Sequence, residues 1–364
     1  MVEQLRVLCV FAELDRGGAE TMCMNLYRAL DRSLIQFDFV KHTQKKGAYE
    51  DEITALGGRI FVAPQYKGVN HLAYQRWWAK HLKNHPEHSV VHGHYITAAS
   101  VYLAVAKKKH RVTIAHSHSS QPRGNFFERQ IKSIYIKRAK AYSDYCLACS
   151  EEAGEWVFCG REYQIIHNAI DAARFVYNPQ IRNEVRLALE FSEYFVLGTV
   201  GSLSTVKNPF GLLDIFEKVY KDNPNARLLW VGSGPLYSDI EKELIKRDLK
   251  DKVVMTGARG DIERLLQAMD VFLFPSLWEG LGMAAIEAQT SGLPVFCSDC
   301  VPQAVNISGL CCFLPLDRPD LWSKAVSSVD YERKDNRKQI IEAGYGICET
   351  ANIMERFYFQ IVRD

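Results

Sequence analysis

The sequence predicts an α/β protein with two Rossmann-like domains, each a parallel sheet with helices on both faces. Short apolar runs alternate with amphipathic helical segments along the 364 residues. That alternation stops between residues 172 and 192, where Asn, Asp and Pro mark loops, and then starts again. The length also suits two domains, because a domain usually holds about 150 residues.

The first half alternates strands and helices from its beginning. Its strands are apolar along most of their length, as expected of strands buried on both faces of a parallel sheet. Its helices carry apolar residues at helical spacing. The expected strands cover residues 6–14, 38–43, 59–64, 89–95, 111–118 and 145–150, and the expected helices cover 19–31, 73–85, 97–109 and 128–143.

The second half repeats the pattern, and a last helix follows it. The expected strands cover residues 194–203, 226–234, 253–258, 271–277 and 294–298, and the helices cover 209–222, 238–248, 261–269 and 282–292. A final helix over residues 350–364 is apolar and aromatic on one face, so it could cross back onto the first domain. We therefore expect domains at residues 1–175 and 176–345, with a returning helix over 346–364.

Composition places the chain among soluble globular proteins and leaves a membrane contact open. Apolar residues make up 47% and charged residues 24% of the chain. No run approaches the ~18 apolar residues of a membrane span, and the start lacks a signal-peptide pattern. Residues 1–178 hold 24 Lys and Arg against 17 Asp and Glu, a net charge of +7, which leaves −5 for residues 179–364. We expect a cytoplasmic protein.

The basic first half has two interpretations. Residues 106–111 and 132–142 interleave basic and apolar residues, and basic amphipathic helices can lie on anionic lipid at the inner face of the cell membrane. Ordinary solvated helix faces explain the same pattern equally well.

Ten cysteines include two C-x-x-C pairs, Cys146 with Cys149 and Cys297 with Cys300. The pairs are too far apart for a zinc ribbon, which needs about 15–20 residues between them. Small buried thiols in a reducing compartment are the favoured interpretation.

Glycines follow two of the expected strands, at the carboxyl ends where parallel sheets bind ligands. Gly232 and Gly234 let the backbone approach a ligand closely, although tight turns alone also use this spacing. A third glycine at dinucleotide spacing is missing, so a nicotinamide site is not supported. Gly17 and Gly18 precede a helix and could admit a phosphate, but no Walker A lysine follows them.

Lys207 lies between a strand and a helix that begins near Pro209. An ammonium beside the free N–H groups of a helix start favours an anion. A solvated surface lysine is the alternative.

Four histidines lie at the ends of two strands that we expect to be neighbours. His92 and His94, like His116 and His118, are two residues apart, so each pair lies on one face of its strand. A polar crevice with one histidine reaching a ligand is favoured. Metal binding is the alternative, but the sequence identifies no further ligand.

The stretch PSLWEGLGMAAIEAQTSGLPV combines acids with glycines at a strand end. The amides around Leu281 and Gly282 would open a helix and could bind phosphate. Glu287, farther into that helix, could accept hydrogen bonds from sugar hydroxyls. Glu279 precedes the helix and should hold hydroxyls rather than charge, because a phosphate repels a carboxylate. Helix-dipole stabilisation explains either acid singly, but not the glycines and the spacing.

These residues resemble the retaining glycosyltransferases of family 4, which have the GT-B fold of two Rossmann-like domains facing each other across a cleft. The stretch above matches the family's E-x7-E pattern. GGAE, HSHS, IIHNAID, VGSLSTVKN, WVGSGP and TGARGDIERLLQAMDVFLFPS follow in the family's order over nearly the whole chain. GLCCFLPLD is similar to enzymes of bacterial capsule and exopolysaccharide synthesis.

The resemblance implies a role for each matching residue. Glu287 would bind the ribose, Glu279 the donor sugar, and Lys207 the departing diphosphate. The Leu281 and Gly282 amides would bind the diphosphate, Gly232 and Gly234 would help to bind the donor, and the loop of Gly257, Ala258 and Arg259 would contact the base. In the first half, Gly17 and Gly18 would close over the phosphates and acceptor, and His116 or His118 would line the sugar pocket. Asn168 would belong to the hinge.

Ser202 departs from the family pattern, which has an arginine there. One bidentate phosphate contact is therefore missing, and Arg259 or Arg16 could compensate.

The resemblance implies transfer of a sugar, with retention, from a nucleotide sugar, with UDP as the favoured nucleotide, to a glycan or polyprenyl-diphosphate-linked acceptor. No Asp-x-Asp motif is present, so neither a metal nor a resident cofactor is expected, and no nucleic-acid partner is expected. A non-catalytic sugar-nucleotide-binding subunit and a GT-B-like epimerase or phosphorylase are the alternatives.

Overall fold

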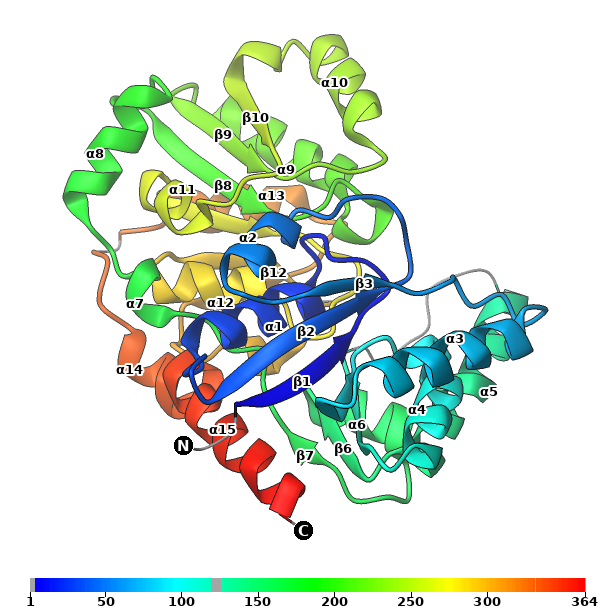
Figure 1. The fold of residues 1–364 in the computed structure, drawn as a ribbon. Coiled ribbons are helices and arrows are strands. Elements are labelled where there is room, and N and C mark those ends of the chain that lie inside the picture. Colours follow the sequence, from blue (N-terminus) through cyan, green and yellow to red (C-terminus); the bar gives the residue numbers. More distant parts are fainter. Residues whose placement is uncertain (1–3, 119–125, 331, 364) are drawn as a thin grey trace. The chain divides into compact units, whose positions relative to one another are not determined.

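The computed structural model describes residues 4–118, 126–330 and 332–363 (Figure 1). The chain divides into two compact units. The first joins Met1–Ile170 with Gly344–Asp364, and the second is Asp171–Ala343.

The first unit is built on a seven-stranded parallel sheet with the order β3-β2-β1-β4-β5-β6-β7. The strand order reverses between β1 and β4, and such sheets bind ligands at the carboxyl ends of the strands at this point. The strands are β1 (Leu5–Val10), β2 (Ile35–Lys41), β3 (Ile60–Val62), β4 (His88–Gly93), β5 (Val112–Ser117), β6 (Tyr145–Ala148) and β7 (Gln164–Ile165). The helices are α1 (Gly18–Ala29), α2 (Glu50–Ala55), α3 (His71–Asn84), α4 (Ala99–Lys108), α5 (Phe126–Tyr142), α6 (Glu151–Phe158) and α15 (Ile347–Arg363).

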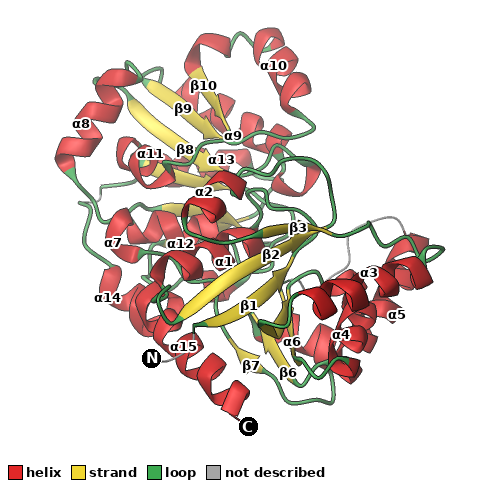
Figure 2. Cartoon of the chain, viewed as in Figure 1, coloured by secondary structure: helices red, strands yellow, loops and turns green. Residues whose placement is uncertain are grey.

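Successive side chains of β1 point alternately into two cores of this unit, one on each face of the sheet. Val7 and Cys9 pack with α1 and α15 on one face, where Tyr358 of α15 is fully buried. Leu8 and Val10 pack on the other face, in a core that α3, α4, α5 and α6 share (Figure 2). Both faces of β1 are therefore covered, which explains its continuous apolar sequence.

The second unit has a six-stranded parallel sheet with the order β10-β9-β8-β11-β12-β13. Its core joins buried residues of β8, α9 and α13, including Leu197, Phe216 and Trp322. The strands are β8 (Phe195–Val200), β9 (Ala226–Val231), β10 (Val253–Gly257), β11 (Val271–Phe274), β12 (Val295–Ser298) and β13 (Cys311–Leu314). The helices are α7 (Ala172–Phe175), α8 (Pro179–Ala188), α9 (Pro209–Asp222), α10 (Tyr237–Lys246), α11 (Ile262–Ala268), α12 (Met283–Thr290), α13 (Pro319–Ser327) and α14 (Arg337–Ile340).

The region expected to hold loops, residues 172–192, is largely helical. Asn178 accepts hydrogen bonds from the amides of Gln180 and Ile181, and Pro179 occupies the first turn of α8. Asn and Pro thus begin a helix here, because both residues are favoured at helix starts as well as in loops. Among the described residues, no helix has both the length and the apolar composition needed to cross a membrane.

Candidate functional site

The loops after β8, β9 and β10 meet at the carboxyl edge of the second sheet. The amide of Gly232 donates to the carbonyl of Gly257 at 2.9 Å. Gly232 has φ +145°, and a Cβ atom there would lie 1.9 Å from the carbonyl oxygen of Gly201. At Gly234 a Cβ atom would lie 2.5 Å from the carbonyl oxygen of Leu203. Packing of backbone on backbone therefore requires both glycines.

Lys207 and Glu279 form an ion pair at this edge. Lys207 ends a short 3-10 turn after β8, and Glu279 lies in the loop between β11 and α12. Lys207 Nζ donates to Glu279 Oε1 at 2.5 Å and lies 5.0 Å from the centre of the Phe274 ring. The side chains are 29% and 12% exposed, so water reaches the ammonium more than the carboxylate. The fold thus joins two predicted site residues that lie 72 positions apart.

A small pocket at the ends of β8 and β11 contains the Lys207 side chain and is also lined by Ser202 and Phe274. Ser202 is exposed, and its hydroxyl bonds that of Ser204 at 3.0 Å. Ser202 therefore adds a short neutral side chain beside the lysine and leaves space toward solvent.

The start of α12 presents unpaired amides near this pocket. Gly282 precedes the helix with φ +104°, and a Cβ atom there would lie 2.8 Å from the Phe274 ring. Within the described residues, the amides of Leu281, Gly282 and Met283 donate to no backbone or side-chain acceptor. Free amides at the positive end of a helix dipole favour an anion such as phosphate.

Glu287 lies farther along α12 and is half-buried. Burial, followed by the charge of Glu263, raises the pKa of the Glu287 carboxyl from 4.5 to about 7. Within the described residues its carboxylate has no hydrogen-bond partner. A carboxyl group in this state gains from hydroxyl donors, which would stabilise its charge.

Arg259 is committed to a local contact. Its guanidinium makes a two-pronged contact with Asp261, at 2.8 and 2.7 Å. The arginine is 46% exposed, so the contact is weak enough to open for a competing anion.

In the first unit, Gly17 and Gly18 begin α1. The Gly17 amide donates to the carbonyl of Asp15 at 2.8 Å, and a Cβ atom on Gly17 would lie 2.2 Å from Oε2 of Glu20. A Cβ atom on Gly18 would meet nothing within 4 Å, so the backbone is open to an approaching group there.

The four histidines at the carboxyl ends of β4 and β5 form one stacked cluster. His92 Nε2 lies 3.2 Å from His116 Nδ1, and His94 Nδ1 lies 2.8 Å from His118 Nε2. His92 Nδ1 also bonds the hydroxyl of Tyr358 on α15 at 2.6 Å. The sequence pattern indicated the histidines but not Tyr358. On the apolar face of a helix, a tyrosine whose hydroxyl bonds a histidine has the same pattern as one that only packs in the core.

Burial keeps these imidazoles neutral. It lowers the pKa of His116 well below its ordinary value, and the charge of His118 adds to the effect. It lowers the pKa of His118 to about 4, although the nearby side chain of Asn168 opposes this shift. Nε2 of His116 is buried and has no hydrogen-bond partner among the described residues. Such an atom favours a further polar group.

The family comparisons agree with this geometry. Residues 16–174 match the model of Glycosyltransferase Family 4, and residues 181–344 match the model of Glycosyl transferases group 1. A putative glycosyltransferase of Bacillus subtilis, EpsF, is 33% identical over 93% of this chain and 91% of its own. The chain belongs to the group 1, family 4 glycosyltransferases. The prediction of the family from the sequence is thereby confirmed.

Other relatives are named for capsular polysaccharide biosynthesis or for a lipid-linked acceptor. A capsular polysaccharide biosynthesis glycosyltransferase of Staphylococcus aureus, CapH, is 25% identical over 78% of each chain. The Escherichia coli UDP-Gal:alpha-D-GlcNAc-diphosphoundecaprenol alpha-1,3-galactosyltransferase is 34% identical over 54% of each chain.

Solved structures bear on the fold. Anabaena HepE in complex with UDP and glucose superimposes with a TM-score of 0.74 at 18% identity, over 99% of this chain and 97% of its own. A Rickettsia africae glycosyltransferase gives a TM-score of 0.76 at 15% identity and covers 100% of both chains. With the two parallel α/β units, this confirms the predicted GT-B fold class.

Proposed function

We propose that this glycosyltransferase moves a sugar from a UDP-linked donor to a glycan or polyprenyl-diphosphate-linked acceptor, with retention and without a metal ion in the transfer step. The observation that carries the proposal is the partly exposed Lys207 ammonium, held by Glu279 in the same loop region as the free amides of α12. A lysine and unpaired amides are the groups that hold a diphosphate.

In the proposed step, the bond between the anomeric carbon and the diphosphate oxygen breaks as an oxocarbenium-like centre develops. Lys207 and the α12 amides stabilise the charge on the departing diphosphate. The acceptor oxygen forms the new bond on the face that the diphosphate leaves, and its proton passes to a diphosphate oxygen. The protein's part is electrostatic and positional.

In this proposal, the two acids interact with hydroxyl groups of the donor. Glu287 accepts from the ribose, since its carboxylate lacks a partner and its raised pKa shows a charge that needs donors. Glu279 contacts the sugar when Lys207 turns to the diphosphate. His116 and His118 are the first-unit groups we propose for contact with the sugar or acceptor, and both are neutral at physiological pH.

Names of relatives support the donor and acceptor classes. The E. coli relative is named for UDP-Gal and for an acceptor on diphosphoundecaprenol, and the HepE structures contain UDP or UDP-glucose. The absence of an Asp-x-Asp motif in the sequence supports metal independence of the transfer.

The test is a donor panel of UDP-sugars with and without an undecaprenyl-diphosphate-linked sugar. Release of UDP should require both substrates, and the product's anomeric proton coupling should match the donor's configuration. An inverted anomer would refute retention, and complete loss of transfer with a chelator, restored by Mg²⁺, would refute metal independence.

A non-catalytic sugar-nucleotide-binding subunit is the second candidate, because Ser202 supplies no positive charge where the family has an arginine. It predicts UDP binding without turnover on any acceptor. Conversion of the donor sugar without acceptor would instead indicate an epimerase.

We also propose a peripheral contact with anionic membrane through the basic ends of α4 and α5. Lys107 and Lys108 lie in the last turn of α4, where Lys107 pairs with Asp144 at 2.7 Å and Lys108 is exposed. The side chains of residues 119–132 and 134 lie outside those that the structure describes. Salt-sensitive sedimentation with phosphatidylglycerol vesicles, weakened by Lys108→Glu, would support this contact, and its absence would refute it.

A further inference from the structure

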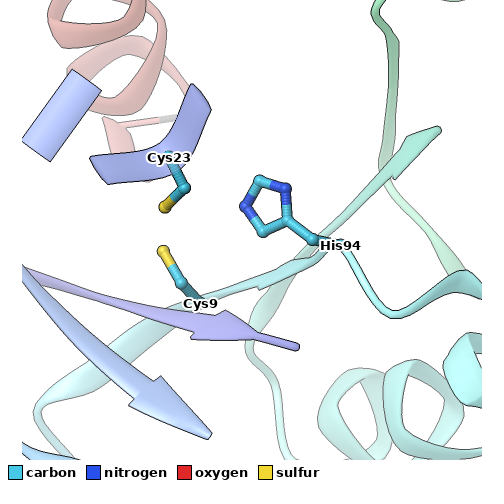
Figure 3. Close-up of side chains that lie close together, drawn as sticks. All are labelled: Cys9, Cys23 and His94. Atoms are coloured by element: carbon cyan, nitrogen blue, oxygen red, sulfur yellow. The ribbon is translucent and has the colours of Figure 1, made fainter. Parts of the chain in front are cut away.

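A second group of metal-ligating side chains lies beside the histidine cluster. Cys9 of β1, Cys23 of α1 and His94, which follows β4, place their ligand atoms within 4.8 Å of one another (Figure 3). Cys9 and Cys23 are 0% and 1% exposed, and His94 is 9% exposed. Figure 3 shows one ring nitrogen of His94 directed toward the two sulfur atoms.

The hydrogen bonds of His94 leave that nitrogen available. Nδ1 is bonded to His118 Nε2 at 2.8 Å, whereas Nε2 is buried and has no partner among the described residues. If Nδ1 donates its proton to His118, Nε2 carries a lone pair facing the thiols. A second hydrogen bond that fixes the tautomer in this way accompanies almost all histidine metal ligands.

We propose that Cys9, Cys23 and His94 Nε2 bind a Zn²⁺ ion in the first unit. Two thiolates and an imidazole are ligands that zinc prefers, and tetrahedral geometry leaves a fourth position for water. On binding, each thiol loses its proton to solvent as its sulfur–metal bond forms, so the two thiolates neutralise the ion's charge. The three ligand atoms lie within 4.8 Å of one another, so small side-chain rotations would place each of them about 2.0–2.3 Å from one shared ion.

Charge and hydrogen bonding favour this trio over the neighbouring one. His92, His94 and His116 also lie within 4.8 Å of one another. Three neutral imidazoles would leave a buried double positive charge uncompensated. His92 and His116 also bond each other, and His92 bonds Tyr358, so ring nitrogens of that trio are already in use.

Such an ion would order the histidine cluster without entering the sugar-transfer step. It would keep the proton of His94 on Nδ1 and therefore fix the tautomer of His118 as an acceptor at Nε2. The Nδ1–H of His118 could then donate to Asn168, whose Oδ1 is otherwise buried without a partner. The inference does not depend on the donor or acceptor proposed above.

The test uses the full chain with its exposed cysteines Cys159, Cys300, Cys312 and Cys348 replaced by serine, after reduction and removal of metal by a chelator. Titration with Co²⁺ should give a sulfur-to-metal charge-transfer band that saturates at one equivalent, and Zn²⁺ should displace it. Cys23→Ser should weaken Co²⁺ binding by roughly 100-fold or more. Replacing a residue that only hydrogen-bonds a metal ligand already lowers metal affinity, and replacing the ligand itself should lower it at least as much.

Cys297→Ser is the matched control, because Cys297 is also a buried thiol next to another cysteine, Cys311, but lies in the second unit. It should leave the band unchanged. The absence of a stoichiometric sulfur-to-metal band in the background chain, or an unchanged band in Cys23→Ser, would overturn the proposal. Should Cys23→Ser fail to fold, X-ray absorption of the Zn²⁺-loaded background chain decides: two sulfurs per zinc support the site, and nitrogen and oxygen ligands alone refute it.

Discussion

Glu287→Gln should stabilise the second unit at alkaline pH while weakening its binding of a nucleotide. The folded state raises the pKa of the Glu287 carboxyl from 4.5 to about 7, first through burial and then through Glu263. The folded state therefore binds this proton more tightly than the unfolded state does. The contribution of Glu287 to stability is full below pH 4.5 and is lost as the pH rises through 7.

The size of the stability change follows from the difference between the folded and unfolded pKa values of Glu287. A tenfold change in proton affinity is worth ~1.4 kcal/mol, which gives a ceiling of about 3.4 kcal/mol at full ionisation. Since Glu287 is partly exposed, solvent screening reduces this to about 1–2 kcal/mol. Glutamine carries no charge, so Glu287→Gln should be more stable than the unsubstituted chain by about that amount at pH 8, with a difference below about 0.5 kcal/mol at pH 5.

Urea unfolding with pulse proteolysis would measure this, with the fragments identified by mass spectrometry so that unfolding of the second unit is resolved. Glu342→Gln is the control, because its side chain is 64% exposed and its substitution should change stability little at either pH. UDP should raise the stability of the Glu287→Gln chain less than that of the unsubstituted chain. Equal pH dependence for Glu287→Gln and the unsubstituted chain would refute the electrostatic argument.

Gly232→Ala should destabilise the second unit by about 3 kcal/mol or more in urea, because its Cβ atom would lie 1.9 Å from a backbone oxygen; Gly280→Ala, with open space, should not. Equal stabilities would contradict the backbone packing described. Asp38→Asn should cost about 3–5 kcal/mol in the first unit, since the buried carboxylate balances two arginines, whereas the exposed Asp51→Asn should be near neutral by the same measurement. Ser202→Arg should tighten UDP binding roughly tenfold in calorimetry by adding a charged donor beside the pocket; unchanged affinity would show that no phosphate lies there.

Sequence patterns predicted the alternation of elements well and their ends less well. The first strand was expected over residues 6–14, but β1 ends at Val10. Phe11 and Leu14 are 2% exposed and continue the apolar run into the following loop. Burial of a loop after a parallel strand gives the same apolar signal as the strand itself, so periodicity alone does not separate them.

The site shows a similar limit. The ion pair of Lys207 with Glu279 joins segments from two separate strand ends, and no local spacing predicts it. The resemblance named both residues because it matches motifs in chain order. The cluster of Cys9, Cys23 and His94 has no motif, since its members come from β1, α1 and the end of β4 and meet through the packing of α1 on the sheet.

Initial rates of UDP release with a UDP-sugar and a lipid-linked acceptor, for the unsubstituted chain and Lys207→Met, test the central claim most directly. Removing one group that stabilises departing charge typically costs about 10²–10³ in rate, and the same loss is expected here, with the fold intact by circular dichroism. Turnover of Lys207→Met equal to that of the unsubstituted chain would contradict the assignment of Lys207 and the α12 amides to the diphosphate.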